Sequence, residues 1–283
     1  NAPLLLPEQP LVYDWLAQRK VSWCAYQSGD FLPFFSLMGS WLPEIATSLT
    51  LSQIGGRGRF RRYDRFNDEW QSDATMPSVI FIEPEYTDGP HVSPNDDHSP
   101  TGIAPGQAFL SEVYHTLISN PARWAKTMLV ITYDEHGGFF DHVPPLKIPT
   151  TVAGAPIATT GVRVPAFIVS PYVREGDVFT GPLDHTSILQ LLDDRFGGGP
   201  GYSVAVNQRQ ASFDRILNAL TPTPRSSTIP MMAQPPHLAL RAALPAKPSA
   251  PNTSNAQALH MAAQKLAAEH ADLLAQPGWE DLN

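Results

Sequence analysis

The stretch from Met128 to Pro145 reads MLVITYDEHGGFFDHVPP, and it places a dense group of polar side chains directly after an apolar run. The run Met128–Ile131 is short, continuous and rich in strand-favouring residues, as is typical of a strand covered on both faces in an α/β sheet. Open α/β sheets bind their ligands beyond the carboxyl ends of their strands. The residues that follow Ile131 are therefore the first candidates for a functional site.

Asp134 and Glu135 are the candidate metal ligands in this stretch. In a continuing strand their side chains would point to opposite faces, but Gly137 and Gly138 allow a sharp turn that brings both carboxylates towards one pocket. Such hard oxygen donors suit Ca, Mg or Mn ions, and Zn accepts carboxylates alongside histidine. For the Asp-Glu pair alone, a solvated turn with a hydrogen-bonding aspartate is the alternative.

Strand-like and helix-like segments alternate between residues 77 and 196. The helix expected over Gly106–Ile118 carries an apolar stripe at helical spacing, the pattern of a helix packed on a sheet: Phe109, Val113 and Leu117. The alternation predicts an α/β fold with a parallel or mostly parallel sheet and right-handed crossovers. Nearer the N-terminus, Leu11–Leu16 is expected to form a short helix and Val21–Tyr26 a strand.

Thr132–Pro145 resembles the signature of the phosphoesterase family that includes bacterial phospholipases C and secreted acid phosphatases. Ser78–Pro84 is similar to the strand and turn that lead to a histidine in that family, matched here by His98. Val164–Pro171 resembles the family's next strand, and Asp184–Leu192 resembles its next histidine-bearing helix start. The resemblance covers residues 10–200 and implies a three-layer α/β/α fold like that of alkaline phosphatase, with a mostly parallel central sheet.

The resemblance also implies roles for individual side chains. Asp134 and Glu135 match the acidic metal-binding pair, and His98 matches the histidine that contacts the substrate phosphate, so His98 is the catalytic and substrate-binding candidate. His185 is similar to the late histidine that contacts metal or phosphate. His136, inside the signature, is a further substrate-binding candidate. Without the family, His98 is equally a loop or helix-capping histidine beside two aspartates.

Three more polar residues near these candidates are expected to support them. His142 lies inside the signature, where it could orient a carboxylate, donate to phosphate or satisfy buried backbone groups. Asp141 and Asp184 each precede a histidine. We expect both to fix the tautomer of an imidazole ring, as carboxylates next to metal-binding or catalytic histidines commonly do.

Two elements of the family pattern have no match in this sequence. Family members carry a Glu-Asn pair that binds metal and, further on, a Ser or Thr nucleophile, and no Glu-Asn pair occurs here. We therefore expect the C-terminal part of a metal-dependent phosphate-ester hydrolase, of acid phosphatase or phospholipase C type. Its hydroxyl nucleophile would lie on a missing N-terminal polypeptide. The alternative is an inactive relic or fragment that serves as a cation-binding or partner-binding module.

Composition excludes several other classes of function. Only 16% of the residues are charged and the net charge is -8, which argues against nucleic-acid binding. The basic stretch Arg57–Arg65 is expected to be a solvated loop or a phosphate-binding cluster. No apolar run approaches the ~20 residues of a transmembrane helix. Cys24 has no second cysteine in this sequence with which to form a disulfide. Separately, the resemblance to the phosphoesterase family implies a periplasmic or secreted protein.

The sequence divides into three parts. Residues 1–220 are expected to form the C-terminal part of the phosphoesterase domain. Residues 221–254 are rich in proline, which favours an extended strap. In residues 255–283, Leu259, Leu266 and Leu273 recur every seven residues behind a possible cap at Asn255, so we expect a helix that docks on the domain.

Overall fold

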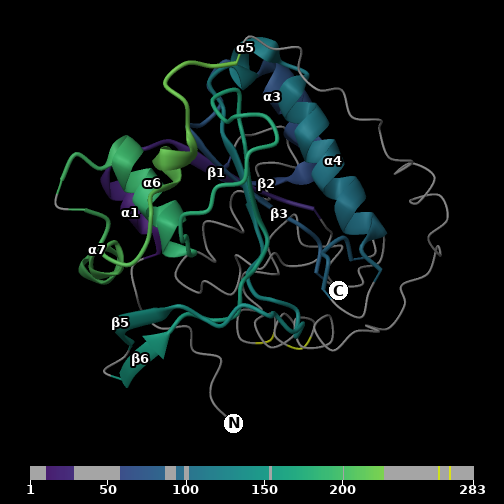
Figure 1. The fold of residues 1–283 in the computed structure, drawn as a ribbon. Coiled ribbons are helices and arrows are strands. Elements are labelled where there is room, and N and C mark those ends of the chain that lie inside the picture. Colours follow the sequence, from purple (N-terminus) through teal and green to yellow (C-terminus); the bar gives the residue numbers. More distant parts are fainter. Residues whose placement is uncertain are drawn as a thin grey trace. The chain divides into compact units, whose positions relative to one another are not determined.

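The computed structural model describes residues 11–28, 58–86, 94–98, 102–152, 155–199 and 201–225, together with Met261 and Ala268. The chain divides into two compact units, and most of their helices and strands are labelled in Figure 1. The first unit comprises Asn1–Gln9, Ser22–Asn120 and Met231–Asn283, and the second comprises Pro10–Val21 and Pro121–Pro230. Each unit has buried apolar side chains of its own.

A three-stranded parallel sheet lies in the first unit. β1 (Trp23–Gln27) is the central strand, between β2 (Phe60–Arg62) and β3 (Val79–Glu83). Every residue of β1 is buried, as expected for a central parallel strand that is covered on both faces. The strands predicted at Val21–Tyr26 and Ser78–Glu83 are confirmed, and they pair in parallel.

Two helices of the first unit pack against each other. The indole N–H of Trp70, in α3 (Phe66–Ser72), donates a hydrogen bond of 3.1 Å to the carbonyl of Leu117 in α4 (Ala104–Ile118). The apolar stripe predicted on α4 is confirmed, because all three of its members are buried: Phe109, Val113 and Leu117. The ring of Phe109 also meets Tyr63 edge-on, with 4.8 Å between the ring centres.

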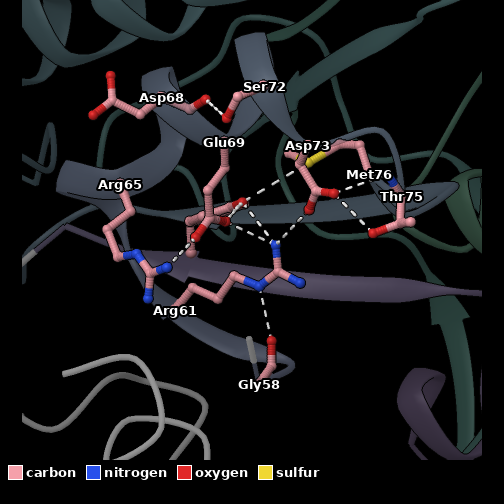
Figure 2. Close-up of polar contacts among 10 residues, drawn as sticks. Gly58, Arg61, Arg65, Asp68, Glu69, Ser72, Asp73, Thr75 and Met76 are labelled. Atoms are coloured by element: carbon pink, nitrogen blue, oxygen red, sulfur yellow. Dashed lines mark hydrogen bonds and ion pairs between the residues drawn. The ribbon is translucent and has the colours of Figure 1, made fainter. Parts of the chain in front are cut away.

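The prediction of a loop for the basic stretch Arg57–Arg65 is wrong for the second half of that stretch. Strand β2 and the 3₁₀ helix η3 (Tyr63–Arg65) lie there, and Arg61 is only 7% exposed. Figure 2 shows the reason: the Arg61 guanidinium faces Glu69 of α3, with 2.8 Å between Nη1 and Oε2. A buried arginine requires such a carboxylate partner. That partner lies eight residues away, where no sequence pattern indicates it.

The side chains of β1 extend this buried polar cluster. The Tyr26 hydroxyl donates a hydrogen bond of 2.5 Å to the Glu69 carboxylate, and burial raises the pKa of Tyr26. Burial likewise raises the pKa of the Cys24 thiol to about 12. Both side chains therefore stay protonated at neutral pH, and Cys24 is a core residue.

The second unit contains two antiparallel strand pairs. β4 (Leu129–Thr132) pairs with β7 (Ala166–Val169), and β5 (Lys147–Val152) pairs with β6 (Ala155–Thr159). Strands β4 and β7 confirm the strands expected at these positions. The helices of the unit are α1 (Val12–Gln18), α5 (Pro121–Trp124), α6 (Thr186–Phe196), α7 (Val204–Arg209) and the 3₁₀ helix η4 (Ile216–Ala219).

The direction of pairing in the second unit differs from the expectation of a parallel sheet. β4 and β7 run antiparallel, with Leu129 opposite Val169. Parallel neighbours need a crossover connection, usually a helix. Between β4 and β7 the described residues, 133–152 and 155–165, contain the β5–β6 pair and no helix. The prediction of parallel strands is correct for β1, β2 and β3 and wrong for β4 and β7.

The C-terminal predictions fall largely outside the described residues. Of the proline-rich strap, 221–225 are described, and the backbone N–H groups of Thr221 and Arg225 donate to the carbonyls of Tyr172 and Pro171. Of the C-terminal helix, Met261 and Ala268 are described, both as helical. The domain boundaries stay predictions. None of the helices in the described residues combines the length and apolar character needed to cross a membrane.

Candidate functional site

The signature loop begins where β4 ends, at Thr132, and its backbone is shaped by two glycines. Gly137 and Gly138 have φ angles of 67° and 80°, and the Phe139 N–H donates to the carbonyl of His136 over 3.2 Å. Two successive positive φ angles are the pattern of a type I′ turn, which glycine adopts without strain. The sharp turn predicted from the double glycine is therefore confirmed.

The two candidate metal ligands lie on the exposed side of this loop. Asp134 and Glu135 are both exposed. The Glu135 carboxylate accepts a hydrogen bond of 2.7 Å from the Gly137 N–H, and its Oε2 lies 3.5 Å from Nδ1 of His136. The turn thus brings Glu135 and His136 together, while both carboxylates remain accessible from solvent.

His185 reaches the same loop from the beginning of α6. Its Nε2 lies 2.7 Å from the backbone carbonyl of Tyr133, the residue before Asp134. A carbonyl oxygen only accepts hydrogen bonds, so Nε2 carries the hydrogen in this contact. In the neutral ring, Nδ1 is then the nitrogen with a lone pair for a ligand. The structure therefore brings a histidine 52 residues away in sequence next to the signature.

The prediction that Asp184 holds the ring of His185 is wrong, because the Asp184 carboxylate has other partners. Its Oδ1 accepts hydrogen bonds from the N–H and hydroxyl of Thr186, at 2.9 and 2.6 Å. Its Oδ2 forms an ion pair with Arg209 at the end of α7. Asp184 instead satisfies the first turn of α6, where N–H groups lack helical partners. By holding the backbone of Thr186, Asp184 fixes the start of α6, where His185 lies.

Asp141 is also predicted to hold an imidazole ring, but its main partner in the structure is an arginine. Arg163 binds it through two nitrogens, at 2.6 and 2.8 Å, and the Val143 N–H donates to it at 3.0 Å. The Arg163 hydrogen bond, helped by Val143, lowers the pKa of Asp141. His142 is more distant, with Nδ1 3.6 Å from Oδ1 and its side chain 85% exposed. Asp141 therefore stays ionised and fastens the signature to Arg163.

His98 lies in the first unit and is half-buried. Its neighbour Asn95 fastens this segment beyond the carboxyl ends of two parallel strands. The Asn95 side chain accepts from the Glu85 N–H at 2.6 Å and donates to the Ser28 hydroxyl at 2.9 Å. Ser28 directly follows β1, and Glu85 follows β3 by two residues. His98 is thus close in sequence to an anchor at the edge where open α/β sheets bind ligands.

The candidate residues therefore form two groups. In the second unit, His185 contacts the loop that holds Asp134, Glu135 and His136, and in the first unit His98 follows the Asn95 anchor by three residues. Sequence reasoning missed Arg163, Arg209 and Asn95. No motif marks these three residues, because each acts through partners 10 to 67 residues away.

The turn predicts a stability effect of Gly138→Ala. A Cβ at Gly138 would meet no atom within 4 Å, so its cost comes only from the positive φ of 80°. We expect a loss of about 1–2 kcal/mol in the free energy of unfolding, measured by urea denaturation. Gly161→Ala is the matched control, because its Cβ also meets nothing and its φ is not positive. Equal stabilities of the two variants would contradict the positive φ angle at position 138.

The acidic loop at the end of β4, with His136 within it and His185 against it, is a polar and partly exposed site on an α/β protein. Residues 5–198 match the model of the Phosphoesterase family. The chain belongs to this family, which confirms the resemblance found in the sequence.

Named relatives are phospholipases C. The chain is 34% identical over 218 residues to the non-specific phospholipase C6 of Arabidopsis thaliana, covering 69% of the chain and 42% of that protein. It is 34% identical over 195 residues to phospholipase C A of Mycobacterium tuberculosis, covering 61% and 34%. It is 28% identical over 219 residues to the hemolytic phospholipase C of Pseudomonas aeruginosa, covering 64% and 29%. The chain thus spans less than half the length of these relatives.

Proposed function

We propose that this chain is part of a metal-dependent phosphate-ester hydrolase of the phospholipase C type. The observation that carries the proposal is the contact of His185 with the loop that holds Asp134, Glu135 and His136, in a chain of the phosphoesterase family. The names of the relatives favour phospholipase C over acid phosphatase. The finer fold that goes with this function is the three-layer, alkaline-phosphatase-like arrangement.

The donor set fits a divalent cation in part. Asp134 and Glu135 are adjacent, exposed carboxylates with the hard oxygens that Ca, Mg and Mn prefer and that Zn accepts. Among the residues that the structure describes, no three His, Cys, Asp or Glu side chains are grouped so that they could hold a metal. These two carboxylates would therefore supply part of the coordination, and the remaining ligands would come from elsewhere in the protein.

Each site residue has a defined task in the proposed reaction. A bound cation would supply positive charge against the phosphoryl oxygens. In the second unit, His185 would present Nδ1 to the phosphate while Nε2 stays bonded to Tyr133. Phosphate contact by His98, in the first unit, stays a prediction from the resemblance. His136 would orient Glu135. The hydroxyl nucleophile is assigned outside these residues, because the family motif that precedes it has no counterpart in this sequence.

Hydrolysis of two soluble substrates tests this function. We expect release of p-nitrophenol from p-nitrophenylphosphorylcholine, faster than from p-nitrophenyl phosphate and lost in EDTA. Intact mass of the purified material under denaturing conditions tells whether a second polypeptide accompanies the 31.0 kDa chain. Cation binding without turnover, even after an N-terminal polypeptide has been supplied, would instead support a cation-binding or partner-binding module.

A further inference from the structure

Two phenylalanines project from the signature loop into solvent. Phe139 is 65% exposed and Phe140 is 92% exposed, although large apolar side chains are usually buried. They directly follow the turn at Gly137 and Gly138, and Glu135 directly precedes that turn and bonds to the Gly137 N–H. The two phenylalanines and Glu135 therefore belong to one loop. An exposed aromatic pair this close to the site needs an apolar partner.

The residues that follow the pair in sequence are mostly apolar, and their one carboxylate is paired. Pro144, Pro145 and Leu146 follow in the same segment and are exposed, Leu146 by 44%. Asp141 is the only acidic residue between Phe139 and Leu146, and Arg163 neutralises it through two hydrogen bonds. No unpaired carboxylate within this segment would therefore be carried into a low-dielectric phase.

We propose that Phe139 and Phe140 insert into the surface of a phospholipid bilayer and hold the signature loop at the depth of the lipid headgroups. The site loop and the aromatic pair share one turn, so insertion would bring Asp134 and Glu135 to the phosphodiester of a lipid. Aromatic side chains are favoured at the membrane–water interface. This inference rests on the proposed function for its substrate, and it commits to zwitterionic phosphatidylcholine because the two exposed carboxylates would be repelled by anionic lipid.

Vesicle flotation of the protein with phosphatidylcholine vesicles tests the insertion without requiring turnover. The double variant Phe139→Ala/Phe140→Ala is expected to partition into vesicles roughly ten- to a hundredfold less than the wild type, as the loss of two buried aromatic side chains implies. Phe140→Trp is expected to retain partitioning. Val204→Ala is the matched control, because Val204 is 75% exposed at the start of α7 and lies outside the signature loop in sequence.

Turnover separates this inference from the proposed function. The double variant is expected to hydrolyse p-nitrophenylphosphorylcholine like the wild type and to lose activity only on phosphatidylcholine vesicles. Wild-type vesicle binding by the double variant would overturn the insertion and leave the proposed function intact. Equal losses on the soluble and vesicle substrates would also overturn it, because the pair would then pack within the protein. If the wild type binds vesicles through the pair but hydrolyses neither substrate, the proposed function fails and the insertion stands.

Discussion

Asp134→Asn is expected to lower chelator-sensitive hydrolysis of p-nitrophenylphosphorylcholine by more than ~100-fold, since even residues that only support metal ligands cost 10- to 100-fold. Calorimetric titration with Ca, Mg, Mn and Zn ions is expected to show weakened binding of the cation that supports turnover. The fold should be unaffected, because Asp134 is exposed and exposed substitutions usually change stability by less than ~0.5 kcal/mol.

Asp177→Asn is the matched control for the loss of one carboxylate. Asp177 is an exposed aspartate of the same unit, 3.8 Å from the guanidinium of Arg174, and it lies outside the signature. It should bind cations and turn over substrate like the wild type. Unchanged cation affinity and turnover in Asp134→Asn would show that this carboxylate is not a ligand and that the solvated-turn interpretation is correct.

Arg61→Leu is expected to lower the free energy of unfolding by about 3–5 kcal/mol, the cost of breaking a buried ion pair by removing one partner. Arg61 donates to Glu69 at 2.8 Å and to the carbonyl of Gly58 at 2.8 Å, and its Nη1 lies 4.0 Å from Asp73 (Figure 2). Side chains of Glu69 and Asp73 are 6% and 1% exposed. Removal of Arg61 leaves these two buried carboxylates with Arg65, 2.9 Å from Glu69, in place of two arginines. Urea denaturation followed by tryptophan fluorescence measures the loss.

Arg62→Leu is the control, one residue further along β2. Its side chain is 40% exposed and lies 3.5 Å from the exposed carboxylate of Asp64, a type of pair that contributes only about 0–1 kcal/mol. The double variant Arg61→Leu/Glu69→Leu should recover part of the loss, because one of the two buried carboxylates that face Arg61 is gone. Equal losses for Arg61→Leu and Arg62→Leu would contradict the burial of Arg61.

Local patterns in the sequence predict most of the elements around the site. The apolar run before Asp134, the stripe on α4 and the run before Glu83 correspond to β4, α4 and β3. The double glycine predicts the turn. These features depend on residues within a few positions of one another, where side-chain periodicity and backbone conformational preference act directly.

Features that depend on distant partners are not predictable in the same way. The antiparallel pairing of β4 with β7 depends on how the chain returns after β4, and the short apolar strands carry no mark of direction. The burial of Arg61 depends on Glu69, and the role of Asp184 depends on Arg209. An aspartate before a histidine has the same sequence whether it holds the imidazole or the first turn of a helix.

The closed environment of Cys24 gives the chain a practical property for spectroscopy. It is the only cysteine among 283 residues, it is fully buried, and its pKa of about 12 leaves almost no thiolate at neutral pH. Thiol-directed dyes react with the thiolate, so we expect Cys24 to remain unlabelled in the native protein. A cysteine introduced on the exposed rim of the signature loop would thus accept a single fluorophore without removal of the natural residue.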